Sequence, residues 1–396
     1  MLAQSAVVPS SSQHVGGPTV LIPDNQQEAS QSEERINLVQ RPSQPASLCV
    51  ETIRRRWQAE GVPPEVVNIA IASRRRSSTR VYDSRLAKFF EWAASHAVDP
   101  LEATPVQLTT FFTHLFSEGR QASTIRNYRS AIVAVHRGFA DGTTIGDNFL
   151  IAQVFRGIFN KRPPTKRLAP SWSINDVLAM LAKPPYEPMS NTPLELLTYK
   201  TLFLVAAASA RRRGCLHALT VKQDFFRFDP NGVRLLPDPQ FLAKNQSASF
   251  TPSEIFLPTM QTGSSIAEDK LYCPVRALKW YVERSKPVRT SDKLFILPRR
   301  PFTPASKSTL SRWIVNLIKP FTQEGETVRA HDLRGHATSK AWFGLIQLED
   351  IMKAAAWKTP SSFVSHYLTD MVTAEGAFAR SVLRVPRRGV PSPPPV

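Results

Sequence analysis

Two stretches decide which fold we expect of this chain: RAHDLRGHATS at residues 329–339 and AAAWKTPSSFVSHYLTD at residues 354–370. In the first, His331 and Arg334 are three residues apart, so on a helix their side chains share a face. In the second, Trp357 is followed by Tyr367. A histidine, an arginine, an indole N–H donor and a tyrosine together suit an attack on a phosphate group. The His–Arg pair alone is common in helices, but its combination with the downstream Trp–Tyr segment is a strong signal.

The composition favours a polyanionic partner. The 396 residues include 50 Lys and Arg against 32 Asp and Glu, a formal net charge of +18, and the length allows two domains with flexible ends. Such an excess points first to nucleic acid and second to a membrane surface. Arginine binds two phosphate oxygens at once through its planar guanidinium, and it dominates clusters at 54–56, 74–76 and 211–213.

The cysteines and the hydropathy indicate in which cellular compartment the protein is expected. Cys49, Cys215 and Cys273 are widely separated and odd in number, which predicts no disulfide framework or CxxC metal pattern and favours a reducing compartment. We expect neither a signal peptide nor a membrane span, because no apolar run of about 18 or more residues is present. The sequence therefore predicts a soluble intracellular protein, and the arginine clusters favour the nucleus.

Helical periodicity falls in two regions separated by a basic, proline-rich segment. In the first region Pro105 opens one expected helix and Ser123 caps the next. The basic segment either lies along a phosphate backbone or is simply solvated. The expected organisation is a disordered segment (1–50), an all-helical domain (66–162), a basic linker (163–170), a mixed domain (171–385) and a disordered Pro-rich tail (386–396).

The mixed domain is expected to be mainly α with a small β-sheet, which makes the fold class α+β. A helix begins at Ser173, and a long apolar helix over 193–210 ends at the arginine triplet. Pro-Asn-Gly at 230–232 lies between two apolar runs and predicts a β-hairpin. Helical periodicity returns over 273–286 and 309–321, before the His–Arg pair.

On these residues the chain resembles the tyrosine recombinases of the phage integrase family, and in detail it is similar to those of eukaryotic mobile elements. The resemblance covers about residues 66–385 and is strongest between Ala206 and Asp370. It implies a helical core-binding (SAM-like) domain at 66–162 and a DNA breaking-rejoining catalytic domain at 171–385. In that family the two domains form a C-shaped clamp around the duplex. The implied function is site-specific recombination or integration of double-stranded DNA by a homo-oligomer, a tetramer on DNA, with no membrane partner.

The resemblance assigns the first phosphate-binding arginine, found in a G-x-R-x-S-E-L motif, to Arg212. Two departures affect it: Ala210 replaces the glycine, and Gly214-Cys215 replaces Ser-Glu, so the glutamate that normally supports this region is missing. Arginines that end a helix can also simply complement its dipole. The lysine that protonates the leaving oxygen is assigned to Lys244, with Lys222 as the competing candidate, although a hairpin lysine can also merely discourage strand pairing.

The remaining assignments fall on the two opening stretches. His331 is either the proton acceptor or a hydrogen-bond donor to a nonbridging phosphate oxygen, and Arg334 is the second arginine that binds the phosphate. Trp357 stands where most relatives have histidine, and it either donates one hydrogen bond to phosphate or packs in the core. Tyr367 is the nucleophile, activated by neighbouring cations, and a structural tyrosine is the alternative. His336 is expected either to pack or to support the site residues without touching the substrate. No cofactor is expected, neither metal nor nucleotide, since we find no P-loop motif and no carboxylate cluster for two-metal catalysis.

Expected DNA contacts lie outside the catalytic residues and mostly touch phosphate: Arg126, Arg129, Lys161 and Arg162. Two other interpretations stay open. The first is a catalytically inactive descendant that binds DNA without cutting it, which the missing Ser-Glu motivates. The second is a type IB topoisomerase, which shares the phosphotyrosine chemistry.

Overall fold

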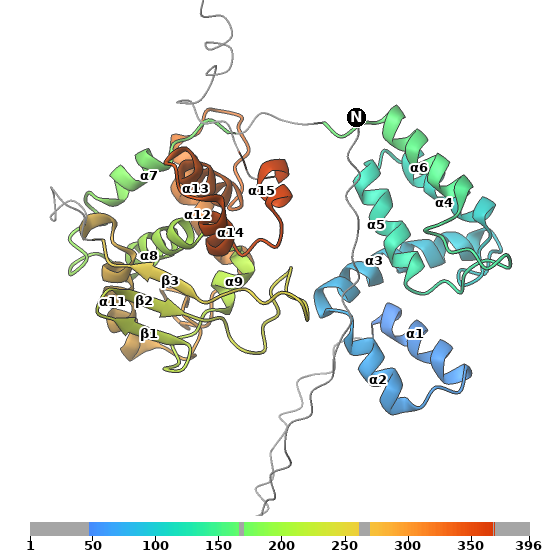
Figure 1. Cartoon of the computed structure of the whole chain (residues 1–396), viewed down its shortest axis with the longest axis horizontal. Helices are drawn as coiled ribbons and strands as arrows, with labels where there is room; N and C mark the ends of the chain where they lie inside the picture. Colours follow the sequence, from blue (N-terminus) through green and yellow to red (C-terminus); the bar gives the residue numbers. More distant parts are fainter. Residues whose placement is uncertain (1–46, 166–169, 261–269, 367, 369–396) are drawn as a thin grey trace, which may run out of the picture. The chain divides into compact units, whose positions relative to one another are not determined.

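The computed structural model describes residues 47–165, 170–260, 270–366 and 368 (Figure 1). The chain divides into two compact units, Met1–Lys166 and Arg167–Val396, and the division falls inside the expected linker. Residues 1–46 and 386–396, which were expected to be disordered, lie outside the described residues.

The first unit has only helices as regular elements in its described residues. They are α1 (Leu48–Ala59), α2 (Pro64–Ala72), α3 (Arg76–Ser95), α4 (Pro105–Ser117), α5 (Ala122–Val133) and α6 (Phe149–Lys161). Aromatic rings join them: the Phe89 ring of α3 lies 4.9 Å from Phe111 of α4, and Phe112 lies 5.0 Å from Phe155 of α6. All four side chains are buried, each contributing roughly 1.5–3 kcal/mol to folding, so this core holds the helices together.

Helix α1 lies before residue 66, where the helical domain was expected to begin, so that boundary was wrong. Ser47 caps α1 by accepting a hydrogen bond from the Val50 amide, and Ser47 and the Cys49 amide both donate to Asp83 of α3 at 2.8 and 2.9 Å. Cys49 and Ile53 are buried in the core of the unit. The helix is amphipathic: its apolar face is buried in the unit, and the hydrogen bonds to Asp83 fix its start on α3.

The caps of α4 and α5 differ in how well the sequence predicted them. Pro105 begins α4 as expected, and Thr104 and Gln107 complete a capping box there. Helix α5 begins earlier than expected, with Gln121 at the cap position and no side-chain cap bond, so the prediction of Ser123 as N-cap was wrong. Ser123 falls within the first turn of α5.

The second unit combines helices with a small sheet, which confirms the expected mainly α fold with a small β-sheet. Its helices are α7 (Ile174–Leu181), α8 (Leu194–Ser209), α9 (Arg213–Ala218), α11 (Pro274–Ser285), α12 (Lys307–Ile318), α13 (Asp332–Phe343), α14 (Leu348–Ala355) and α15 (Pro360–His366), with short 3₁₀ segments η1 (Lys286–Val288) and η2 (Lys319–Phe321). Strands β1 (Phe226–Asp229), β2 (Gly232–Leu235) and β3 (Ile255–Pro258) pair antiparallel in that order.

The hairpin predicted from Pro-Asn-Gly is confirmed as the β1–β2 turn, in which Asp229 pairs with Gly232. A Cβ atom at Gly232 would overlap the Leu257 carbonyl and the Phe256 ring of β3. Glycine is therefore required there by the close approach of the third strand.

Helix α8 is the centre of the second unit (Figure 1). It contacts α11, α12, α13 and β3, and its buried residues are spread around its circumference. The long apolar helix expected over 193–210 is confirmed, and the structure adds that it is covered on all sides. The arginine triplet directly follows the end of α8, which also contacts α13.

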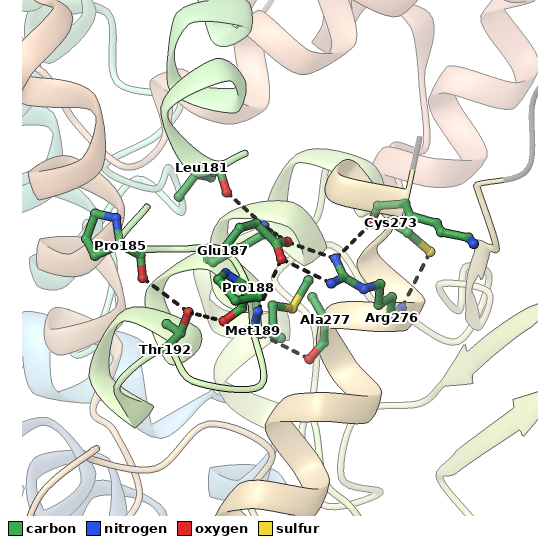
Figure 2. Close-up of polar contacts among 12 residues, drawn as sticks. Leu181, Pro185, Glu187, Pro188, Met189, Thr192, Cys273, Arg276 and Ala277 are labelled. Carbon is green, nitrogen blue, oxygen red and sulfur yellow. Dashed lines mark hydrogen bonds and ion pairs between the residues drawn. The ribbon is translucent and has the colours of Figure 1, made fainter. Parts of the chain in front are cut away.

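A buried ion cluster anchors α8 to its surroundings (Figure 2). Lys200 is 0% exposed; its Nζ donates to the Glu187 carboxylate and, at 2.7 Å, to the carbonyl oxygen of Leu181. Arg276 of α11 donates to both oxygens of Glu187, at 2.8 and 3.0 Å. Burial alone would raise the pKa of Glu187, but the hydrogen bonds and charges of Arg276 and Lys200 outweigh it and lower that pKa. The cluster ties the loop after α7 to α8 and α11.

Candidate active site

The His–Arg pair is located at the first turn of α13. His331 is the N-cap residue of α13, and its carbonyl oxygen accepts from the Arg334 amide at 3.1 Å. The two residues therefore lie on the first turn of α13, in the second unit.

Arg334 is almost fully buried, with 3% of its surface exposed. Its Nη2 donates to the carbonyl oxygen of Ala355 at 2.7 Å, and its guanidinium lies 4.7 Å from the centre of the Trp357 ring. A cation over an indole face is stabilised by the ring quadrupole. Arg334 therefore connects α13 to the segment that follows α14.

Trp357 packs in a small hydrophobic cluster. The ring lies 5.5 Å from Phe363 of α15, and Ala210, Ile351 and Ala355 complete the buried cluster. Trp357 is 3% exposed. The packing alternative raised from the sequence thus describes part of what Trp357 does, and its contact with Arg334 places the same ring beside the expected phosphate-binding arginine.

The three arginines after α8 have different surroundings. Ala210, which replaces the family glycine, ends α8 in the left-handed conformation at φ 48°, at a cost of roughly 1–2 kcal/mol for a residue with a Cβ. Arg211 is buried, and its Nη2 donates to the carbonyl oxygens of Ser253 and Glu254 at 3.0 and 3.2 Å. Arg213 is exposed and donates to Ser311 at 3.1 Å. Arg211 is therefore a brace on the backbone before β3.

Arg212 is half-buried, and its hydrogen-bond partner differs from those of Arg211 and Arg213. Its Nη1 donates to Oδ1 of Asn245 at 3.3 Å. Arg212 also contributes to the electrostatic field at His331, as described below. Cys215, which replaces the family glutamate, is buried in α9, and its amide donates to the Arg212 carbonyl at 2.8 Å. A side-chain amide from another loop thus contacts Arg212 in a region where the family pattern has a glutamate.

The two candidate lysines lie in different places. Lys244 is exposed in the connection between β2 and β3, and its charge is among those that act on His331. Lys222 forms an exposed ion pair with Asp292 at 3.6 Å and does not figure among the principal charges at His331. The structure therefore brings Lys244, and not Lys222, into the electrostatic environment of the His–Arg pair.

The electrostatics of His331 reveal which side chains converge. Burial first, and then the positive charges of Arg334, Arg212, Lys244 and Arg213, lower the pKa of His331 to about 4. His331 as a whole is exposed, so only part of the imidazole is shielded from water, and solvent screens these repulsions. At neutral pH the imidazole is therefore uncharged within a group of cations.

Asn245 is the residue that the sequence reasoning missed. Its Nδ2 donates to the carbonyl oxygen of Ala356, while its Oδ1 accepts from Arg212. Its only signal in the sequence is that a polar side chain directly follows Lys244.

Tyr367 lies outside the described residues, and α15 ends at the residue before it. His336 is 8% exposed and its ring lies 4.2 Å from that of Trp172, which confirms its expected packing role.

The expected DNA contacts of the first unit fall into two kinds. Arg126 on α5 and Lys161 at the end of α6 are exposed, and the Arg129 guanidinium lies 5.0 Å from the Phe155 ring centre. Arg162 instead donates from Nη1 to the carbonyl oxygens of Phe116 and Arg120 at 3.1 and 2.8 Å. Arg162 thus satisfies carbonyl groups at the end of α4.

Comparison with known proteins gives structural likenesses only, since no family model and no curated protein matches the chain. The chain is similar to a XerA recombinase at 14% identity and TM-score 0.37, covering 85% of this chain and 98% of that one. It is similar to a lambda integrase dimer bound to a COC′ core site at 15% identity and TM-score 0.48, covering 81% and 95%. It is also similar to the XerH site-specific recombinase bound to palindromic difH substrate, at 16% identity and TM-score 0.48, covering 80% and 83%.

These proteins are recombinases and integrases, the kind that the sequence resembles. Likeness at this level assigns no role to any residue, so the catalytic and DNA-binding roles given above stay predictions. Within the described residues, no helix combines the length and apolar character needed to cross a bilayer.

Proposed function

We propose that this chain is a site-specific DNA recombinase that cuts and rejoins duplex DNA through a covalent 3′-phosphotyrosyl link to Tyr367. One observation carries the proposal. Arg334 and Arg212 come from separate parts of the second unit, and hydrogen bonds join them: Arg334 donates to the Ala355 carbonyl, and Arg212 donates to Asn245, which holds the next carbonyl, that of Ala356. Together with Lys244 they place positive charge around His331 and lower its pKa.

A group of cations that repel one another is a site prepared for an anion. The leading charges at His331 are all positive, so a bound phosphate would relieve the repulsion among them. Two guanidiniums can each contact two oxygens, and they neutralise charge that develops on a phosphorane. Such a site suits a polyanion better than a neutral substrate or a cation.

With Tyr367 as the nucleophile expected from the sequence, the proposed residues complete a transesterification. The Tyr367 oxygen attacks the phosphorus, and its proton passes to the neutral imidazole of His331. The bond to O5′ breaks with its electron pair on O5′, and Lys244 supplies the proton that makes the free 5′-hydroxyl. A 5′-hydroxyl of another strand then attacks the phosphotyrosyl ester, returns a proton to Lys244, and releases Tyr367, which recovers its proton from His331.

The pKa of His331 leaves its imidazole free to accept a proton but makes it a weak base before substrate binds. An imidazole with a pKa of about 4 is uncharged at neutral pH and can take a proton. Phosphate between the arginines would offset their charge and raise that pKa toward its ordinary value. The basicity of His331 would therefore increase when substrate binds.

The finer parts of the proposal are supported by the sequence resemblance and the net charge of +18. We infer that the chain acts on double-stranded DNA as a homo-oligomer, a tetramer when assembled on DNA, and serves a mobile element in the nucleus. The exposed Arg126 and Lys161 on the first unit suit contacts with the phosphate backbone.

Trapping on a suicide substrate tests the proposal. Nicked duplexes release a short 5′-hydroxyl strand after cleavage, so a covalent adduct accumulates and survives denaturation. We expect an adduct with the unmodified chain and none with Tyr367→Phe. Tyr272→Phe is the matched control, because Tyr272 is a partly exposed tyrosine of the same unit, and its loss of a hydroxyl should keep the adduct.

The non-cutting descendant remains the second candidate, and the replacement of Ser-Glu by Gly214-Cys215 is the observation that favours it. Tight, salt-sensitive duplex binding without an adduct would establish it and refute cleavage by Tyr367. Relaxation of supercoiled DNA without strand exchange would instead indicate a topoisomerase.

A further inference from the structure

Asn245 makes two hydrogen bonds that no other single side chain of its size and charge could make together. The Arg212 guanidinium only donates and the Ala356 carbonyl only accepts, so the partner between them needs one acceptor and one donor. A carboxamide has both on one planar group. An aspartate would repel the carbonyl oxygen, and an aliphatic residue would satisfy neither group.

The carbonyl that Asn245 holds is next to the one that Arg334 holds. Arg334 donates to the Ala355 carbonyl and Asn245 donates to the Ala356 carbonyl, so two consecutive peptide units join the two arginines. Ala356 has a left-handed backbone conformation, at φ 50° and ψ 57°, which turns the chain between α14 and the buried Trp357. Asn245 therefore fixes Arg212 relative to Arg334 through a turn of unusual geometry.

The same loop carries Lys244, which is exposed and has a long flexible side chain. The next residue, Asn245, is hydrogen-bonded to both Arg212 and Ala356. These bonds anchor the backbone at Lys244, while the Lys244 side chain extends from the surface. A second bond joins this loop to the same segment, from Lys358 Nζ to Ser249 Oγ at 3.1 Å. Both partners of that bond are exposed, so it contributes little to stability.

We propose that Asn245 is a positioning residue that aligns Lys244 and Arg212 with the turn at Ala356, which precedes Trp357. The inference rests on the proposed function, because it assigns Lys244 the proton for the leaving oxygen. Asn245 itself is not a reacting group. It acts by holding the β2–β3 connection, through the amide, on the turn at Ala356.

The first experiment compares two leaving groups in single-turnover cleavage by Asn245→Ala, Asn245→Asp and the unmodified chain. One suicide duplex has the normal 5′-oxygen at the scissile phosphate and the other has sulfur, which leaves as a thiolate without a proton because a thiol has a pKa near 8.5. With oxygen we expect Asn245→Ala to be slower by about 10- to 100-fold, since small misplacements of catalytic groups have effects of this size. With sulfur the loss should shrink at least severalfold. Duplex affinity should stay within about twofold.

Asn245→Asp separates the two bonds, because it keeps the acceptor for Arg212 and loses the donor to Ala356. We expect it to show the same dependence on the leaving group. Ser249→Ala is the matched control on the same loop and should cleave both substrates at the unmodified rate. Thermal unfolding of each variant establishes that the second unit is folded.

Equal losses on the two substrates, or a rate for Asn245→Ala within twofold of the unmodified chain, would overturn the inference. A second measurement does not depend on cleavage. If Asn245 holds Arg212 and Lys244 near His331, Asn245→Ala should raise the pKa of His331 in NMR titration, and an unchanged pKa would also overturn it. If the unmodified chain forms no adduct while this titration shows the rise, the proposed cleavage fails and the positioning by Asn245 stands.

Discussion

Replacing Glu187 by glutamine should destabilise the second unit strongly, because it leaves a buried ammonium group without its counter-charge. Lys200 is 0% exposed and Glu187 is 9% exposed, so neither can turn to water without opening the packing between α7, α8 and α11. Glutamine has nearly the same shape as glutamate, so the loss is one of charge and of one bidentate acceptor for Arg276. Breaking a buried ion pair from one side costs about 3–5 kcal/mol.

The structure also predicts how the destabilisation by Glu187→Gln combines with that by Lys200→Met. Lys200→Met alone should cost less, because Glu187 keeps two hydrogen bonds from Arg276. In the double variant the remaining Arg276 has 30% of its side chain exposed and can be hydrated. The two losses should therefore be less than additive, with a coupling energy of roughly 2–3 kcal/mol. Glu195→Gln, at the exposed start of α8, is the matched control and should cost no more than about 1 kcal/mol.

Hydrogen exchange of the α8 amides measures the free energy of opening this unit separately from the first. The lowered pKa of Glu187 means that its carboxylate stabilises the fold above its ordinary pKa near 4.5, and that this contribution is lost as pH falls through the lowered value. The difference between Glu187→Gln and the unmodified chain should therefore shrink in acid. A loss below about 1 kcal/mol at pH 7, or strictly additive losses in the double variant, would refute this account of the cluster.

Three further predictions concern the proposed site and the first unit. NMR titration of His331 should give a pKa near 4 without DNA and a higher one with a bound duplex; since the unfolded value is higher, this group favours folding increasingly as pH rises from about 4 to 6.5, and a pKa that duplex leaves unchanged would contradict the cation cluster. Arg334→Lys should slow adduct formation by about 10²–10³-fold, because an ammonium cannot bind two phosphate oxygens in a fork, and a smaller effect than that of the exposed control Arg213→Lys would argue against a phosphate clamp. Arg126→Ala should reduce the slope of log affinity against log salt by about 1, whereas Arg162→Ala should mainly lower the melting temperature of the first unit through its bonds to Phe116 and Arg120; equal effects of the two on the slope would contradict this division of roles.

The sequence by itself determined the elements whose signals are local. The apolar run before the arginine triplet predicted α8, Pro-Asn-Gly predicted the β1–β2 hairpin, and the three-residue spacing placed His331 and Arg334 on one helical turn. Each of these depends on backbone periodicity or on a turn residue, and such properties act over a few neighbouring positions. The mainly α fold with a small sheet followed from them.

Only the tertiary structure decided which side chains meet. The family motif singled out Arg212 among three adjacent arginines but gave no contacts for any of them; in the structure Arg211 braces the backbone before β3 and Arg212 contacts Asn245. The bond from Asn245 to Ala356 joins residues 111 positions apart. Helix α1 likewise depends on Asp83, which is 34 residues beyond Cys49. Hydrogen bonds of this kind depend on the positions of distant segments in space, and no local pattern of residues encodes those positions.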